Sequence, residues 1–273
     1  MNKIILVTFA LVLSWNLLYS QKTVPKEITT SFQTSALYKP AIHVEADIAI
    51  IYGVDMQEQL VFDGKFHTLE DRINSWREKG YITQFMTGIS WGKYADYFLG
   101  NWDGKKHDDE GQMRENGEVI WHGKNVPYVV PTQNYLEYIK ETQIKRAIDA
   151  GINDIYLEEP EFWAFGGYSS AFKKEWQSYY GVEWQPQHTS AESLYLSNKL
   201  KYHLYYRALE EVFTYAKEYG RNLGRTIKCY VPTHSLINYS QWQIVSPEAS
   251  LASMDCMDGY IAQVWTGTAR VPN

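Results

Sequence analysis

The sequence predicts an α/β protein of the (β/α)8-barrel (TIM-barrel) type, and three observations support this prediction. Short, almost continuous apolar runs alternate with stretches of helical periodicity, which is typical of a parallel sheet covered by helices. Polar side chains follow directly after these runs, at the positions where barrel strands end. No glycine-rich phosphate loop opens an expected helix, which argues against a doubly wound nucleotide-binding sheet.

The first half of the chain contains three expected strands and one expected helix. Residues 47–52 form a compact apolar run that ends at Gly53, and residues 81–86 and 126–130 form the next two runs. Residues 67–79 carry apolar side chains at helical spacing and are followed by a glycine that would end the helix.

Residues 93–124 are polar and aromatic and have no regular period. Loops of this length inside a compact domain are usually functional or disordered. The high aromatic content argues against disorder. We therefore expect a binding loop above the second strand.

The second half continues the alternation. Thr132 is the expected N-cap of a helix that runs to Ala150, where Gly151 closes it. A fourth strand, two helices and two further strands are expected at residues 152–157, 169–180, 191–219, 226–231 and 259–265. A complete barrel has eight βα units. About six units therefore predict a C-terminally incomplete barrel, as a single domain over residues 21–273.

Composition excludes some classes of partner. A net charge of -6 leaves no basic footprint, so a nucleic-acid partner is not expected. The 22 Tyr and 10 Trp offer flat apolar faces with a polar edge, which suit stacking on sugar rings. For most of these residues, packing in an aromatic core is the simpler interpretation. Of the two cysteines, Cys229 lies in an expected strand and is expected to be a buried free thiol.

Residues 1–20 resemble a secretory signal peptide. Lys3 precedes an apolar run over residues 4–13, which Ser14 and Asn16 interrupt before it is long enough to span a bilayer. No cysteine follows the run, so no lipid anchor is expected. The mature protein is therefore expected in the periplasm or outside the cell.

The most informative stretch is the end of the fourth strand. The apolar run 155–157 stops at Glu158, Glu159 and Pro160. Proline has no backbone N–H and cannot continue a central strand, so both glutamates belong at the carboxyl rim, where α/β folds place their chemistry. Adjacent strand residues point to opposite faces, so the two carboxyl groups are not expected to flank one bond. A salt-bridge cluster at a strand end is the structural alternative.

Other expected strand ends also carry side chains that suit a polyol ring. Gln263 and Trp265 are two residues apart and therefore share one face of their strand. Each residue is weak evidence alone, because Glu161 is also typical of a loop or cap and His122 and His234 of polar loops. The candidate substrate-binding residues are Trp91, His122, Glu161, Trp163, Tyr230, His234, Gln263 and Trp265.

The tetrapeptide Leu157-Glu158-Glu159-Pro160 resembles the Asn-Glu-Pro at the end of strand four in clan A retaining glycoside hydrolases, which are (β/α)8 barrels. The resemblance implies that Glu159 is the general acid/base and that Glu158 occupies the place of the asparagine. A carboxylate there departs from the clan and would raise the proton affinity of its neighbour. The clan's nucleophile ends strand seven, which this chain does not reach. Asp55 is the better second acid here, because Asp258 precedes its strand.

The resulting hypothesis is an exported glycoside hydrolase with Glu159 (or Glu158) as acid/base and three tryptophans as sugar platforms. One alternative is a barrel that binds carbohydrate without cleaving it. A second is a metal-dependent sugar isomerase or lyase, although no fixed ligand motif such as His-Glu-x-x-His occurs. No cofactor and no membrane partner are expected. The sugar, the linkage, the stereochemical outcome and the oligomeric state stay open.

Overall fold

A computed structural model of the chain describes residues 29–53, 60–62, 65–92, 94–123, 126–234 and 236–262. The expected signal peptide, Asp55, Gln263 and Trp265 lie outside these ranges. The central element is a parallel sheet with the strand order β1-β2-β5-β8-β10-β12. Its strands are β1 (Ser31–Thr34), β2 (Ile48–Tyr52), β5 (Ile82–Gly88), β8 (Asp154–Glu158), β10 (Lys228–Thr233) and β12 (Gly259–Ala262).

The strand order identifies the sheet as part of a barrel. Every neighbouring pair is parallel, and the strands follow one another in chain order without a reversal. A doubly wound sheet reverses direction at a switch point, whereas a (β/α) barrel does not. The described sheet is therefore a parallel half-barrel of six strands, consistent with the predicted incomplete barrel.

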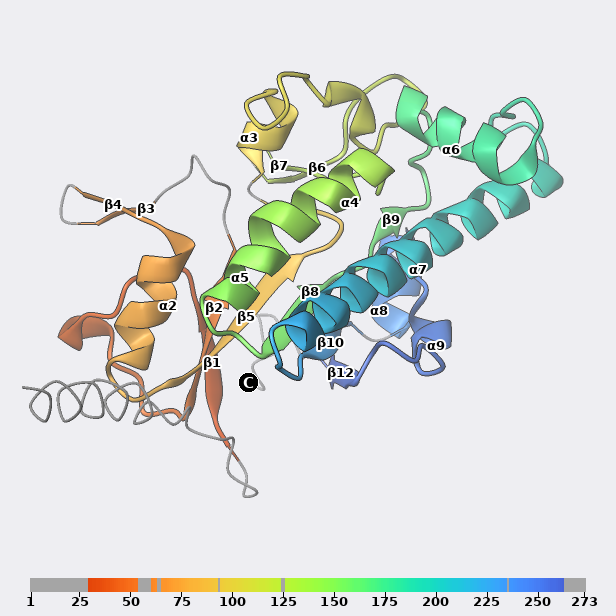
Figure 1. Cartoon of the computed structure of the whole chain (residues 1–273). Helices are drawn as coiled ribbons and strands as arrows, with labels where there is room; N and C mark the ends of the chain where they lie inside the picture. The colour runs from red at the N-terminus through yellow and green to blue at the C-terminus, as the bar shows by residue number, and fades with distance from the viewer. Residues whose placement is uncertain are drawn as a thin grey trace, which may run out of the picture.

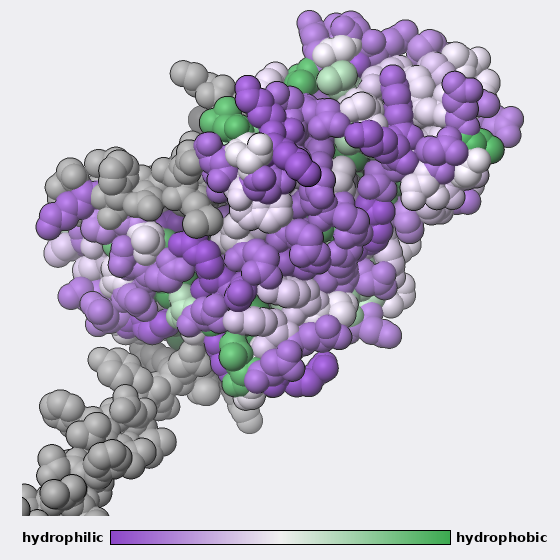
Figure 2. Space-filling model, turned by 45° about the horizontal axis from the view of Figure 1, so that its top comes forward, coloured by the Kyte–Doolittle hydropathy of each residue, from purple (hydrophilic) through white to green (hydrophobic). Residues whose placement is uncertain are grey.

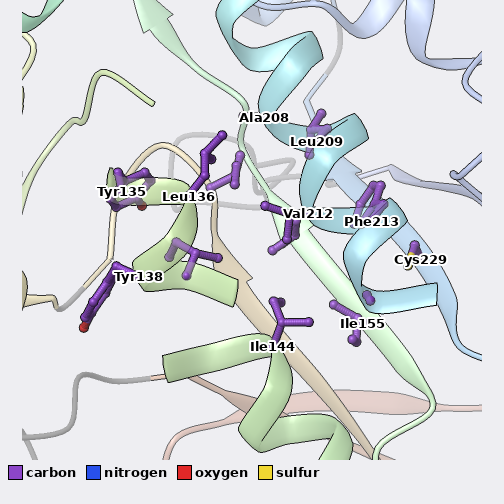
Figure 3. Close-up of a cluster of buried hydrophobic side chains, with 14 of the residues drawn as sticks. Tyr135, Leu136, Tyr138, Ile144, Ile155, Ala208, Leu209, Val212, Phe213 and Cys229 are labelled. Carbon is purple, nitrogen blue, oxygen red and sulfur yellow. The ribbon is translucent and has the colours of Figure 1, made fainter. Parts of the chain in front are cut away.

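Three helices cover one face of the sheet: α2 (Leu69–Arg77), α5 (Lys145–Asp149) and α7 (Ala191–Asn222). Figure 1 shows them side by side along the strands. Alternate strand residues point toward these helices and are fully buried, as Ile155 is where it meets Ile144 and Val212 (Figure 3). Burying one such side chain contributes about 1.5–3 kcal/mol. This core fixes the strands whose carboxyl ends form the candidate site.

The long helices begin at the residues that the sequence predicts. The Thr132 hydroxyl accepts a hydrogen bond from the Tyr135 N–H at 3.2 Å, and α4 (Gln133–Ile139) follows it. A π-helical turn, η3 (Lys140–Ile144), joins α4 to α5, so the predicted helix is confirmed in its extent but not in its regularity. Ser169 and Ser190 cap α6 (Ser170–Tyr180) and α7 through the same kind of contact.

The prediction of a sheet strand at 126–130 was wrong. Only β7 (Val126–Pro127) is a strand there, and it pairs antiparallel with β6 (Trp121–Gly123), outside the main sheet. Beyond Pro127 the chain turns toward the end of β5, where the Val129 N–H donates to the Ser90 carbonyl at 2.8 Å. The strand missing from the prediction is β1, which pairs with β2. Compared with the prediction, the sheet lacks the strand at 126–130 and contains β1 in addition, so β8 is still its fourth strand.

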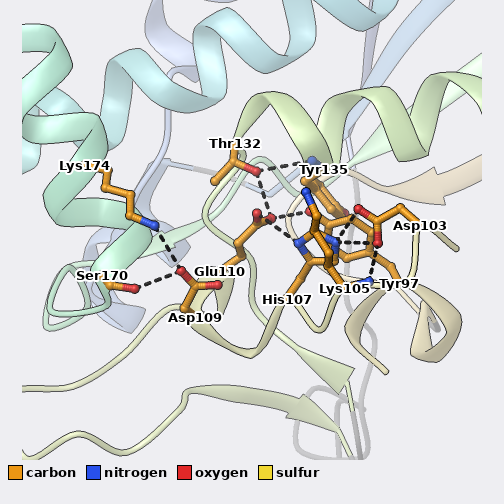
Figure 4. A network of polar contacts seen from close by, with 10 residues as sticks. All are labelled: Tyr97, Asp103, Lys105, His107, Asp109, Glu110, Thr132, Tyr135, Ser170 and Lys174. Atoms are coloured by element: carbon orange, nitrogen blue, oxygen red, sulfur yellow. Dashed lines mark hydrogen bonds and ion pairs between the residues drawn. The ribbon is translucent and has the colours of Figure 1, made fainter. Parts of the chain in front are cut away.

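The stretch expected as a binding loop is largely a packed unit. It contains α3 (Ala95–Phe98) and η2 (Asp108–Glu110), and Tyr97 is fully buried. The His107 ring stacks on Tyr97 at 4.0 Å and lies 3.2 Å from an Asp103 oxygen and 3.3 Å from Glu110 (Figure 4). Glu110 also accepts a hydrogen bond from Thr132 at 2.8 Å. This network ties the stretch to the start of α4.

The face in Figure 2 is mostly hydrophilic, with hydrophobic residues in small, separate groups. Among the residues that the structure describes, no helix combines the length and the apolar composition needed to cross a bilayer. Cys229 is a buried free thiol, as the sequence predicts, and Cys256 is a half-buried one.

Candidate active site

The chain turns sharply where β8 ends, and this turn creates the candidate site. Glu159 adopts a left-handed backbone conformation, with φ of 55°, which is rare for a residue other than glycine. Its N–H donates to the Pro232 carbonyl of β10 at 3.3 Å, and its own carbonyl accepts from the Ser90 hydroxyl beyond β5. The two neighbouring strands therefore hold the turn from both sides.

The carboxyl group of Glu159 is buried, with 7% of the residue exposed, and two aromatic side chains bind it. One oxygen accepts a hydrogen bond from the Trp91 indole N–H at 2.7 Å, and the other lies 2.9 Å from His234 Nε2. The exposed His122 ring stacks on the Trp91 ring, with a distance of 3.7 Å between the ring centroids and an angle of 7° between the ring planes. Residues from the ends of three strands thus fix one orientation of this carboxyl group.

Glu158 makes a different contact. Its Oε1 accepts a hydrogen bond from the Tyr52 hydroxyl at 2.6 Å, and the residue is 5% exposed. Burial, reinforced by the charge of Glu158, raises the pKa of Tyr52 well above its ordinary value, so the phenol keeps its proton. Glu158 is therefore anchored at the end of β2.

Glu161 lies at the centre of an acidic cluster that also contains Glu158, Glu159 and Glu248. It is 3% exposed, and its carboxyl group is hydrogen-bonded to the Tyr128 hydroxyl. Burial raises the pKa of Glu161 to about 9, and the negative charges of Glu159 and Glu248 add to the effect. Burial and the neighbouring charges therefore favour the neutral, protonated form of Glu161, which can act as a proton donor.

Glu248 completes the cluster, and sequence reasoning missed it. It is the first residue of α9 (Glu248–Leu251), is 7% exposed, and its Oε1 has no hydrogen-bond partner among the described residues. Burial raises its pKa to about 7. Strand β9 (Phe162–Trp163) begins directly after Glu161 and pairs with β11 (Ile244–Val245). Glu248 lies three residues beyond β11, so this pairing brings it to the cluster. Pro247-Glu248 otherwise has only the local pattern of a helix start.

The remaining candidates lie at different places. Trp163 is half-buried beside the cluster, with its ring 5.6 Å from that of Tyr128. Tyr230 stacks on Tyr156 and is hydrogen-bonded to Asp154 at the amino end of β8, away from the rim. Asp258 also lies at the amino end, where it accepts from the Cys229 N–H at 2.8 Å. The structure thus brings together Trp91, His122, Glu158, Glu159, Glu161, Trp163 and His234.

Three of these side chains could hold a metal ion. One ligand atom each from Glu159, Glu161 and His234 lies within 4.8 Å of the other two. Two carboxylate oxygens and an imidazole nitrogen form a common ligand set for divalent transition metals. In the described arrangement the histidine instead contacts Glu159 directly. The donor set therefore fits either an ion or a hydrogen-bonded group that transfers protons.

No protein-family model and no curated protein sequence matches the chain. Among solved structures, it is similar to an α-galactosidase from Thermus thermophilus in complex with stachyose, with 13% identity and a TM-score of 0.37 over 83% of this chain and 40% of that chain. For α-L-fucosidase isoenzyme 2 from Paenibacillus thiaminolyticus the identity is 8% and the TM-score 0.42, over 68% and 27% of the two chains.

An isomalto-dextranase from Arthrobacter globiformis complexed with panose gives 12% identity and a TM-score of 0.33, over 68% of this chain and 29% of that chain. The chain therefore spans 40% or less of the length of these three proteins.

Proposed function

We propose that this chain is a glycoside hydrolase that acts on an oligo- or polysaccharide. One observation carries the proposal: two buried carboxyl groups, those of Glu159 and Glu161, offer oxygens within 4.8 Å of each other at the carboxyl rim of a parallel sheet. Glycoside cleavage by the usual route needs such a pair, about 5–5.5 Å apart in retaining enzymes and about 6.5–9.5 Å apart in inverting ones. The close approach favours retention.

The surroundings of the two carboxyl groups suggest their roles. Glu161, with its pKa raised to about 9, carries a proton at neutral pH that it can give to the leaving oxygen. Glu159 receives the Trp91 N–H and the His234 contact, which suit an ionised carboxylate that attacks the anomeric carbon. This proposal moves the acid role from Glu159, where the resemblance to clan A places it, to Glu161.

The reaction then runs in two balanced steps. In the first, the bond from the anomeric carbon to the leaving oxygen breaks, a bond to a Glu159 oxygen forms, and the Glu161 proton moves to the leaving group. In the second, water attacks the anomeric carbon and gives its proton to Glu161, which frees Glu159. Trp163 supplies an apolar face for a sugar ring, since His122 already covers the Trp91 ring.

Separate Glu159→Gln and Glu161→Gln variants test the roles. Stachyose, other oligosaccharides and aryl glycosides serve as substrates, with Glu118→Gln, at an exposed position, as the matched control. We expect Glu159→Gln to lose activity on every substrate. Glu161→Gln should lose about 10²–10⁴-fold on oligosaccharides, and less on aryl glycosides whose leaving group needs no proton. Unchanged hydrolysis by both variants would refute the proposal.

The ligand set of Glu159, Glu161 and His234 favours a second candidate, a metal-dependent isomerase or lyase acting on sugars. Chelator treatment separates the two candidates. Activity that is lost with chelator and restored by a divalent ion supports the second, whereas activity that withstands chelator supports hydrolysis by two carboxyl groups. Saturable glycan binding without turnover would instead identify a carbohydrate-binding barrel.

We also propose that the protein is exported. The support is the sequence alone, because Lys3 and the apolar run after it lie outside the described residues. Cell fractionation, together with N-terminal sequencing of the mature protein, tests this. A product in the cytoplasm that keeps residues 1–20 would contradict it.

A further inference from the structure

We propose that a pocket beside the acidic cluster is a second saccharide site, which binds a sugar unit of the same glycan chain away from the cleaved bond. This distal pocket is lined by Arg114, Asn116, Phe165, Tyr168, Gln187 and His188, together with Glu115. The inference rests on the proposed function and sharpens it, because it makes the substrate an extended oligosaccharide rather than a single sugar on a small aglycone.

The size and lining of the distal pocket fit a sugar. Its volume is about 630 Å³, within the range of about 300–1,000 Å³ that is usual for small-molecule sites. Two aromatic rings, those of Phe165 and Tyr168, line it together with amide, imidazole and guanidinium groups. Such a lining combines apolar faces for ring carbons with hydrogen-bonding groups for hydroxyls.

Arg114 supplies the main free donors. Its guanidinium lies over the Phe165 ring at 4.0 Å, and within the described part of the chain no carboxylate comes within ion-pair distance of it. Stacking leaves the N–H groups at the edge of the guanidinium free for a ligand. Glu115, 3.4 Å from His188, brings a negative charge to the same pocket. The lining therefore has no surplus of positive charge to select an anion, and uncharged sugar hydroxyls fit it better.

The walls of the pocket are held in place without a ligand. The Tyr168 N–H donates to the Met113 carbonyl at 3.2 Å, which joins the 113–119 hairpin to the segment after β9. Gln187 donates to the Ala164 carbonyl at 2.8 Å and accepts from Lys201 Nζ at 2.6 Å. Because these bonds already order the pocket, binding loses less conformational entropy.

A row of aromatic side chains connects the acidic cluster to the distal pocket. Tyr128 is hydrogen-bonded to Glu161, and the Trp163 ring lies 5.6 Å from Tyr128 and 5.2 Å from Phe165. Phe165 in turn lies under Arg114 in the pocket. Tyr128 is buried, but Trp163 and Phe165 are partly exposed, so a glycan that reaches the cluster can pass over these two rings and place a later unit in the pocket. The two sites are therefore parts of one binding surface.

The test measures binding without turnover. Calorimetry on the full chain carrying Glu161→Gln compares disaccharides with stachyose and with the hexaoses of the cello, xylo and manno series. Arg114→Ala, and separately Tyr168→Phe, are added to this background. Arg221→Ala, at an exposed position on α7, is the matched control. We expect Arg114→Ala to raise the dissociation constant of the best hexaose or tetraose about tenfold, with the best disaccharide and the control unchanged.

Each outcome decides the matter. Equal loss for short and long chains, unchanged affinity for long chains, or no binding of any oligosaccharide would overturn the distal pocket. If the protein without Glu161→Gln shows no hydrolysis but Arg114→Ala still weakens only the long chains, the pocket stands and the proposed hydrolysis falls. If hydrolysis depends on Glu159 and Glu161 while neither pocket variant affects any chain length, the hydrolysis stands and the pocket falls.

Discussion

Lys201 gives a prediction about stability that does not depend on the substrate. Its ammonium group is fully buried in α7, where it donates to the Ala164 carbonyl and to Gln187 Oε1, both at 2.6 Å. Burial lowers the pKa of Lys201 from 10.5 to about 7. Below pH 7 both the folded and the unfolded chain are protonated here. Between pH 7 and 10.5 only the unfolded chain keeps the proton, so this group makes the free energy of unfolding rise with pH.

The pH dependence of the free energy of unfolding gives the size of the expected effect. One proton contributes about 1.4 kcal/mol per pH unit, so from pH 7 to pH 9.5 the lysine contributes a rise of about 3 kcal/mol. Lys201→Met keeps a long apolar chain but removes the titrating group. We therefore expect the unfolding free energy of the wild type to gain about 3 kcal/mol relative to the variant across this interval.

Urea unfolding at pH 6, 7, 8, 9 and 9.5 measures this difference. Other titrating groups, including Glu161, are the same in both proteins, so the difference isolates position 201. Lys199→Met, on the exposed side of the same helix, is the matched control. Its free energy of unfolding should change with pH in the same way as that of the wild type. Parallel pH curves for the wild type and Lys201→Met would refute the reasoning.

Two further predictions concern the cluster and the core. Glu248→Gln removes a negative charge that raises the pKa of Glu161. The alkaline limb of the pH profile of kcat/KM should therefore shift from about pH 9 to a pH lower by about one unit. A limb that stays in place or shifts to higher pH would contradict this. The shift requires ionised Glu248 and so appears only above about pH 7. Gly220→Ala would place a Cβ 2.2 Å from Ile227 Cγ1, so thermal and urea unfolding should show a loss of about 1–3 kcal/mol in the free energy of unfolding. Gly123→Ala, whose Cβ would meet no atom of the described residues within 4 Å, should be near neutral.

The elements that sequence predicts well are those determined by near neighbours in the chain. Thr132, Ser169 and Ser190 each cap a helix through a contact three residues away, so a short window contains the signal. The two errors in the strand assignment depend on distant contacts. Residues 126–130 are apolar like a strand, but Val126 pairs with β6 instead of the sheet, and β1 has only the half-exposed Ser31–Thr34 to mark it.

In the candidate site, too, some residues can be predicted from local sequence and others cannot. Pro160 marks the end of β8, so the sequence places Glu158 and Glu159 at the rim. The approach of Glu161 to Glu159 depends on a left-handed turn that no residue type announces, because glycine is its usual sign. Glu248 arrives through the pairing of β11 with β9, which no local pattern encodes.

The backbone at Glu159 has a consequence for how this chain can evolve. A left-handed conformation costs a non-glycine residue about 1–2 kcal/mol, and the Glu159 φ of 55° lies in that region. Glycine would relax the turn but remove the carboxylate. With the role proposed above for Glu159, a library screened only for heat resistance would drift toward glycine at position 159, while one screened for growth on a glycan would keep glutamate. Selection for robustness and selection for chemistry act in opposite directions at this position.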